Sequence, residues 1–90
     1  MNNQIVITFI NEWFQDDIHS LSQAILSSIT EHQIKEHILG ADRENIRFAC
    51  QSNEFLLNFE YYSQSCWIDA HDPESQTNIF TLYRQLEANV

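Results

Sequence analysis

Apolar residues change their spacing along the chain, and each spacing predicts a different element. Residues 5–10 (IVITFI) are apolar at both odd and even positions, which is typical of a strand that is covered on both faces, or of a central strand with a partner on its second face. Later apolar side chains recur with helical spacing and predict a helix over Asp17–Ile29, in which Asp16 or Asp17 caps the first turn. The apolar face of this helix comprises Ile18, Leu21, Ile25, Leu26 and Ile29.

The second half of the chain alternates between apolar and polar residues, which predicts a meander of three antiparallel strands. Its inward-facing residues are Ile46, Phe48, Cys50, Phe55, Leu57, Phe59, Tyr61, Cys66, Ile68 and Ala70. Loops at Gln51–Glu54 and at Ser63-Gln64 bring inward residues opposite one another, as a stable sheet requires. The resulting pairs include Cys50 with Phe55 and Tyr61 with Cys66.

Two further stretches flank the meander. Asp72-Pro73 begins a C-terminal helix with a capping carboxylate and a proline at the first helical position. Thr30–Leu39 is open to two interpretations. Thr30 and Gln33 can form a capping box for a short helix that ends at Gly40, or the segment can be a strand.

These elements occur in the order β-α-(short element)-β-β-β-α. We expect a two-layer α+β fold, in which an antiparallel three-strand meander and an N-terminal strand carry two main helices on one sheet face. The chain has 90 residues, of which 43% are hydrophobic, and it contains one glycine and one proline. This composition argues against disorder and predicts a single domain over residues 1–90.

The formal net charge is −9, because the sequence has 13 Asp and Glu residues but only 4 Lys and Arg residues. Such a surface repels phosphates and anionic lipid head groups, which argues against direct binding to nucleic acid or to a membrane. No apolar run approaches the roughly 20 residues that cross a bilayer, and residues 1–4 carry no basic signal region. We therefore expect a cytoplasmic protein with two reduced thiols.

Candidate catalytic and metal-binding groups do not form a known motif. Cys50 and Cys66 point inward on strands that a third strand separates, so we expect two buried free thiols. His32 and His37 lack the spacing of a zinc-binding helix, and no Cys-x-x-Cys pair occurs. We expect no metal, no cofactor and no catalytic residue. An enzyme of unrecognised type, with Glu60 or a histidine as its acid–base group, is the third-ranked alternative.

An apolar patch falls on the outward face of the predicted meander. Its residues are Leu56, Tyr62 and Trp67, which Val6 and Ile10 can join. Apolar patches of this kind are typical of interaction sites. The alternative is that another segment covers the patch, either Trp13-Phe14 or the undecided stretch after the first helix.

This candidate interface leads to the first functional hypothesis, a non-enzymatic protein-interaction domain that binds a protein partner or forms a homodimer. The second hypothesis is an acidic inhibitor that mimics nucleic acid and blocks a basic protein. That hypothesis requires several carboxylates to gather on one surface, namely Asp42, Glu44, Glu54, Glu60 and Asp69.

Four short strings resemble a known family. They are Glu12-Trp13-Phe14, Gly40-Ala41-Asp42-Arg43, Phe55–Glu60 and Ser63–Ile68. Together they are similar to a family of short gammaproteobacterial proteins in the domain-of-unknown-function series, number 3630, and the resemblance covers most of the chain. It implies a bacterial, cytoplasmic, stand-alone domain. Because the family has no assigned activity, the resemblance implies no functional residue.

Overall fold

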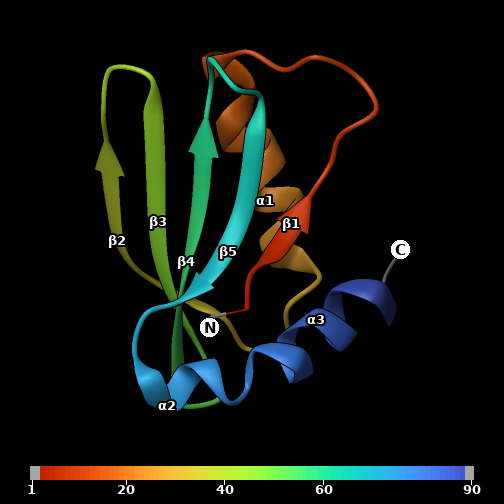
Figure 1. Ribbon diagram of the computed structural model, residues 1–90, viewed down its shortest axis with the longest axis vertical. Helices are drawn as coiled ribbons and strands as arrows, with labels where there is room; N and C mark the ends of the chain where they lie inside the picture. Colours follow the sequence, from red (N-terminus) through yellow and green to blue (C-terminus); the bar gives the residue numbers. More distant parts are fainter. Residues whose placement is uncertain (1–2, 89–90) are drawn as a thin grey trace.

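The computed structural model describes residues 3–88, which form a five-stranded antiparallel sheet with helices packed on one face (Figure 1). The strands lie in the order β1-β5-β4-β3-β2, so β1 and β2 are the two edges. The predicted α+β class is confirmed, with one strand more than expected. In chain order the elements are β1 (Ile5–Ile7), the 3-10 helix η1 (Gln15–Asp17), α1 (Ile18–Ser27), β2 (Gln33–Leu39), β3 (Arg43–Cys50), β4 (Asn53–Glu60), β5 (Ser65–Ala70), α2 (Pro73–Gln76) and α3 (Ile79–Ala88).

The predicted first helix is confirmed as α1, and its apolar face packs on the sheet. Ile18 and Leu26 are buried, as is Ile29 just beyond the helix. Asp17 is the N-cap residue of α1, but the predicted capping by its carboxylate is wrong, because this side chain makes no hydrogen bond to the helix N–H groups. The Asp17 carboxylate accepts the Phe14 N–H at 2.9 Å and closes the 3-10 turn that leads into α1. The core opposite α1 consists of the inward residues of the three central strands, together with Ile79 and Leu82 of α3.

The undecided segment contains a strand rather than a second helix. Residues Gln33–Leu39 pair antiparallel with β3, and all seven are exposed. A strand without a buried face has no hydrophobic alternation, so periodicity could not identify it. Gly40 follows the strand instead of ending a helix, and its N–H donates to the Arg43 carbonyl at 2.8 Å in the turn to β3. The extra strand explains why the sheet is wider than predicted.

The register between β3 and β4 differs from the prediction by two residues. Cys50 pairs with Asn53 instead of Phe55, because a two-residue turn replaces the expected four-residue loop. Both turn residues, Gln51 and Ser52, have positive φ angles of 50° and 70°. This backbone suits a tight hairpin but is normally built with Asn or Gly, so the sequence carried no signal for it. A shift of two residues leaves the same side chains facing inward.

We expect Ser52→Gly to stabilise the fold by about 1 kcal/mol, because glycine adopts a positive φ without the steric penalty of a Cβ atom. Urea unfolding should show a higher midpoint with an unchanged slope. Ser20→Gly is the matched control, since Ser20 lies exposed within helix α1, where glycine is unfavourable. A destabilising effect of Ser52→Gly would contradict the assigned turn.

The register between β4 and β5 also shifts by two residues, and Cys66 pairs with Phe59 instead of Tyr61. A four-residue turn, Tyr61–Gln64, replaces the expected two-residue turn. The Gln64 side chain holds this turn in place. Its amide group donates to the carbonyls of Tyr61 and Trp13 at 2.9 Å each, and its carbonyl oxygen accepts the Trp13 N–H at 2.9 Å. The turn is therefore set by a contact with the N-terminal loop, which a local pattern cannot reveal.

The predicted C-terminal helix begins where expected but is divided into α2 and α3. The Asp72 carboxylate accepts the Ser75 N–H at 2.7 Å, and Pro73 occupies the first turn. This bond lowers the pKa of Asp72. Within residues 3–88, none of these helices has the length and apolar character needed to span a bilayer.

Candidate interface on the outer sheet face

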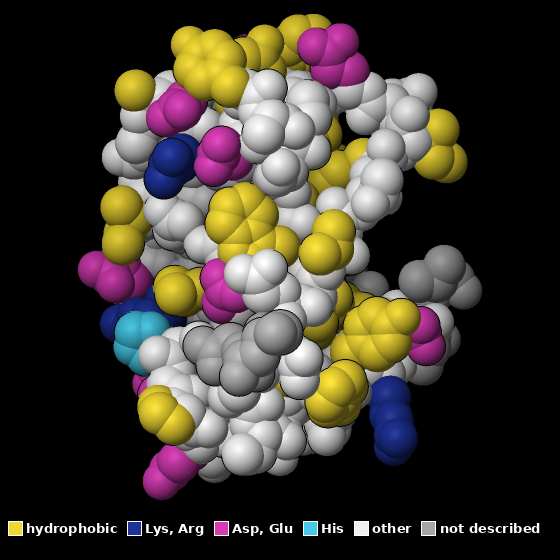
Figure 2. Space-filling model, in the orientation of Figure 1, with side chains coloured by type: hydrophobic (Ala, Val, Ile, Leu, Met, Phe, Trp, Pro, Cys, Tyr) yellow, Lys and Arg dark blue, Asp and Glu magenta, His cyan; other side chains and the backbone are white. Residues whose placement is uncertain are grey.

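The helices cover only one side of the sheet, and we call the opposite side the outer face (Figure 1). Viewed from this side, hydrophobic side chains lie between acidic and basic ones, as Figure 2 shows. Most of its residues belong to the three central strands, β5, β4 and β3. By register, the outer face comprises Val6, Gln33, Glu36, Ile38, Arg43, Asn45, Arg47, Ala49, Glu54, Leu56, Asn58, Glu60, Ser65, Trp67 and Asp69.

A chain of hydrogen bonds fixes the indole of Trp67. Its Nε1 donates to Asp69 Oδ2 at 2.8 Å, and Asn58 Nδ2 donates to the same oxygen at 3.3 Å. Asn45 Nδ2 in turn donates to Asn58 Oδ1 at 2.7 Å, across the pairing of β3 with β4. Asn58 is only 5% exposed although it lies on the outer face. Sequence analysis missed this pair, because only the observed register places the two asparagines opposite each other.

Ion pairs flank this hydrogen-bond chain. Arg47 Nη1 contacts Glu54, and Arg47 Nε lies 3.4 Å from Glu36 Oε1 on the edge strand. The hydrogen bond with Glu54 raises the pKa of Arg47. Arg43 Nε lies 3.7 Å from Glu60 Oε2, directly across the strand pair. Both arginines of the outer face are thus matched by carboxylates of the same face.

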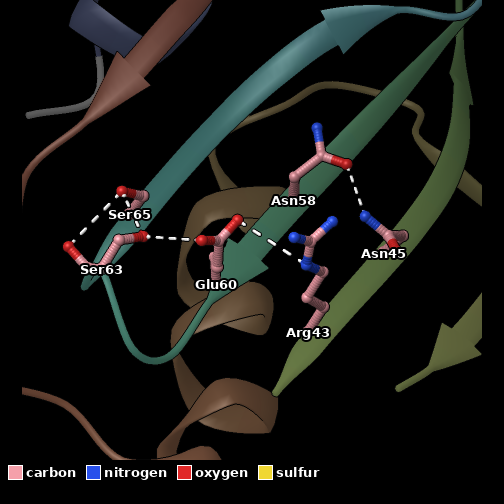
Figure 3. Close-up of polar contacts among 6 residues, drawn as sticks. All are labelled: Arg43, Asn45, Asn58, Glu60, Ser63 and Ser65. Atoms are coloured by element: carbon pink, nitrogen blue, oxygen red, sulfur yellow. Dashed lines mark hydrogen bonds and ion pairs between the residues drawn. The ribbon is translucent and has the colours of Figure 1, made fainter. Parts of the chain in front are cut away.

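Glu60 also connects the outer face to the β4–β5 turn (Figure 3). Its Oε1 accepts the Ser63 hydroxyl at 3.2 Å, and the Ser63 and Ser65 hydroxyl oxygens are 2.8 Å apart. Figure 3 shows Glu60 between Arg43 on one side and the two serines on the other. The Glu60 carboxylate is thus held from two sides, by Arg43 and by Ser63.

The structure brings two of the three predicted interface residues together. Leu56 and Trp67 lie half-buried on the outer face of neighbouring strands. Tyr62 does not join them, because it belongs to the four-residue turn and is 81% exposed there. Val6 pairs with Trp67 and is 72% exposed, which extends the patch onto β1. Ile10 is fully exposed in the loop after β1 and lies apart from the sheet face.

Neither of the segments considered as a cover lies over this patch. Trp13 is buried in the core, where its ring meets that of Phe59 edge-on at a centroid distance of 5.6 Å. The strand Gln33–Leu39 adds to the sheet beside β3 instead of crossing its face. Within residues 3–88, the outer face is therefore left open by the chain itself.

The carboxylates that the inhibitor hypothesis requires do not gather in one row. Glu54, Glu60 and Asp69 lie on the outer face, and each is bound by a partner described above. Glu44 has the opposite orientation on β3, and His37 Nε2 binds it at 2.7 Å. Asp42 lies in the turn before β3. This scattering counts against a nucleic-acid mimic.

A shallow hollow of about 470 Å³ lies beside Trp67, between β1 and the β4–β5 turn, and Glu60 and Cys66 are among its lining residues. Cys66 is 2% exposed, and burial raises the pKa of its thiol to about 12. Such a thiol is protonated at neutral pH and is a poor nucleophile. Among the described residues, no group of three or more His, Cys, Asp or Glu side chains is placed to hold a metal ion.

The expectation of two buried free thiols is confirmed. Cys50 and Cys66 are 3% and 2% exposed, and neither forms a disulfide. They lie on β3 and β5, with β4 between them. The Cys50 thiol donates to the Thr30 carbonyl at 3.4 Å.

The fold and this face define a small acidic α+β domain with one open, polar-aromatic side. The chain belongs to the DUF3630 family, described as a protein of unknown function, whose model matches residues 2–87. Comparisons with curated proteins and with solved structures found no match. The family resemblance predicted from short strings of residues is thus confirmed, and the family description assigns no activity.

Proposed function

We propose that this chain is a non-enzymatic protein-interaction domain, and that the outer face binds a second copy of the chain. The observation that carries the proposal is the position of Trp67. This indole is held by Asp69, lies between Leu56 and the exposed Val6, and has no covering segment within the described residues. Preorganised aromatic residues next to arginines are the side chains that contribute most to protein interfaces.

Charge favours a second copy as the partner. Only four of the 13 acidic residues lie on the outer face, where Arg43 and Arg47 offset them. The other acidic residues are balanced only by Lys35 and Arg84. Two identical acidic chains therefore repel each other least when their outer faces meet. A face that carries both signs of charge also suits a two-fold contact, in which each arginine can approach a carboxylate of the other copy.

The enzyme alternative has less support. The hollow beside Trp67 contains a protonated thiol and a carboxylate that is already bound by Arg43 and Ser63. Acid–base catalysis instead requires a group whose position leaves it free to exchange a proton with a substrate. Neither side chain meets that requirement.

Light scattering coupled to size-exclusion chromatography tests the proposal. We expect a dimer at high micromolar concentration, and Trp67→Asp should weaken it by about thirtyfold, the effect of losing a central aromatic contact. Trp67→Phe should retain most of the affinity. Phe80→Asp is the matched control, because Phe80 is 60% exposed on α3 and lies off the outer face.

Circular dichroism should show that Trp67→Asp remains folded. A wild-type chain that stays monomeric at high micromolar concentration would remove the homodimer from the proposal. A dimer that is equally sensitive to Phe80→Asp would place the contact on another surface.

A further inference from the structure

A second apolar surface lies at the β1 edge of the sheet, away from Trp67. Here a groove of about 330 Å³ runs between α1 and α3. Its walls are mostly apolar and include Ile7, Phe9, Leu21, Ile25 and Leu86. In Figure 2, hydrophobic side chains gather on the side of the molecule where β1 and α3 lie in Figure 1.

The backbone of β1 is open beside this groove. β1 pairs with β5 on one side, and within residues 3–88 no strand pairs with its other side. An edge strand with unpaired N–H and C=O groups can accept a further strand. Helices α1 and α3 present apolar side chains beside β1. A strand added to β1 would direct every second side chain toward these helices.

We propose that the β1 edge binds an extended segment of a partner protein, with apolar side chains in the groove and a Lys or Arg beside Glu87. Strand addition of this kind takes its affinity from backbone hydrogen bonds and its specificity from pockets for alternate side chains. Successive side chains on the same face of a strand are roughly 7 Å apart, so the groove accommodates one or two of them. This site meets the outer face at Val6, which lines the groove as well, but Trp67 and Leu56 do not line it.

The negative charge at the groove favours a partner segment that carries a positive charge. Among the described residues of the lining, Glu87 alone is charged, and it lies at the end of α3 one turn beyond Tyr83. The Tyr83 hydroxyl donates to this carboxylate, which raises the pKa of Tyr83 and holds Glu87 at the mouth of the groove. The chain as a whole carries −9, so a cationic segment is attracted to this groove and an anionic lipid is repelled, whereas a second copy docked here would bring another Glu87 instead of a cation.

A synthetic peptide in which Val alternates with Lys is the direct probe. In an NMR titration we expect saturable shifts of the backbone amides over residues 5–9 and of the Ile25 and Leu86 methyl groups. A peptide in which Val alternates with Glu should bind at least about tenfold more weakly, since its charges are repelled. A central proline in the lysine peptide should weaken binding similarly, because proline cannot donate to an adjacent strand.

Two variants on α1 form a matched pair. Ala24 is exposed and lines the groove, whereas Gln23 is exposed on the same helix and does not line it. Ala24→Lys should reduce affinity for the lysine peptide by about tenfold, through both bulk and charge. Gln23→Lys adds the same charge and should leave affinity within about twofold.

Trp67→Asp separates this site from the outer face, because Trp67 does not line the groove. Peptide binding should survive that variant even if the variant abolishes the dimer. The inference is overturned if the lysine peptide does not bind at about 1 mM. It is also overturned if both peptides bind equally, or if the shifts lie away from β1 and the groove. Protection of the β1 amides by self-association alone would make a second copy the occupant and overturn it as well.

Discussion

Trp13→Ala is expected to destabilise the fold by about 3–5 kcal/mol, the range for removing a large buried aromatic side chain. Trp13 is 3% exposed, and its ring packs edge-on against Phe59 and Tyr61, at centroid distances of 5.6 and 6.2 Å. Its backbone also forms both hydrogen bonds with Gln64. Because the stability of a domain is about 5–15 kcal/mol in total, this one change removes a large part of it.

Phe14→Ala is the matched control for this prediction. The adjacent Phe14 is also aromatic but is 54% exposed, so its loss should cost less than about 1 kcal/mol. Urea unfolding followed by circular dichroism measures both variants. Similar effects for Trp13→Ala and Phe14→Ala would show that Trp13 is not part of the core.

The second large effect concerns Cys66. Burial raises the pKa of this thiol from 9.0 to about 12, so at neutral pH its thiolate is on the order of a thousandfold rarer than in the unfolded chain. Because both thiols are also buried, an alkylating reagent should label neither cysteine readily in the native protein and should add two labels in denaturant. Mass spectrometry counts the labels. Rapid labelling of Cys66 in the folded state would mean that the inward face of the sheet is assigned wrongly.

The same shift makes stability fall at alkaline pH. The folded pKa lies above the unfolded one, so the neutral thiol stabilises the fold fully below pH 9 and this contribution is lost as the pH rises toward 12. The free energy of unfolding should decrease by about 1.4 kcal/mol per pH unit through this group. Cys66→Ala is the comparison, because it should remove that part of the slope. Parallel pH profiles of the two proteins would contradict the assigned shift.

Sequence pattern predicted the inward face of the sheet correctly but not its register. Phe48, Leu57 and Ile68 are each fully buried or nearly so, as alternation indicated. Both hairpin registers were wrong by two residues, an even number that conserves which side chains face the core. Alternation therefore determines the face, whereas the turns determine the register. At Gln51-Ser52 and at Gln64 the turn geometry depends on the rest of the fold.

The positions of the candidate interface residues on the sheet were predictable to a similar extent. Leu56 and Trp67 were identified because large side chains at outward positions break the apolar–polar alternation. Tyr62 was misplaced by the wrong turn length. The bonds of Asn58 with Asn45 and Asp69 depend on which residues lie across the strands, so the sequence alone could not reveal them.

The hydrogen bonds between Trp13 and Gln64 join residues that are 51 positions apart in the sequence. This separation affects how the chain folds while it is being synthesised. The first strand and Trp13 leave the ribosome well before β5 and Gln64, with which they pair. Until then the segment IVITFI has no strand beside it, and apolar strands in that state are prone to aggregate. The meander, in contrast, consists of adjacent hairpins that can form as they emerge. We therefore expect the hairpins to form in the order in which they emerge and β1 to dock last, once β5 is in place.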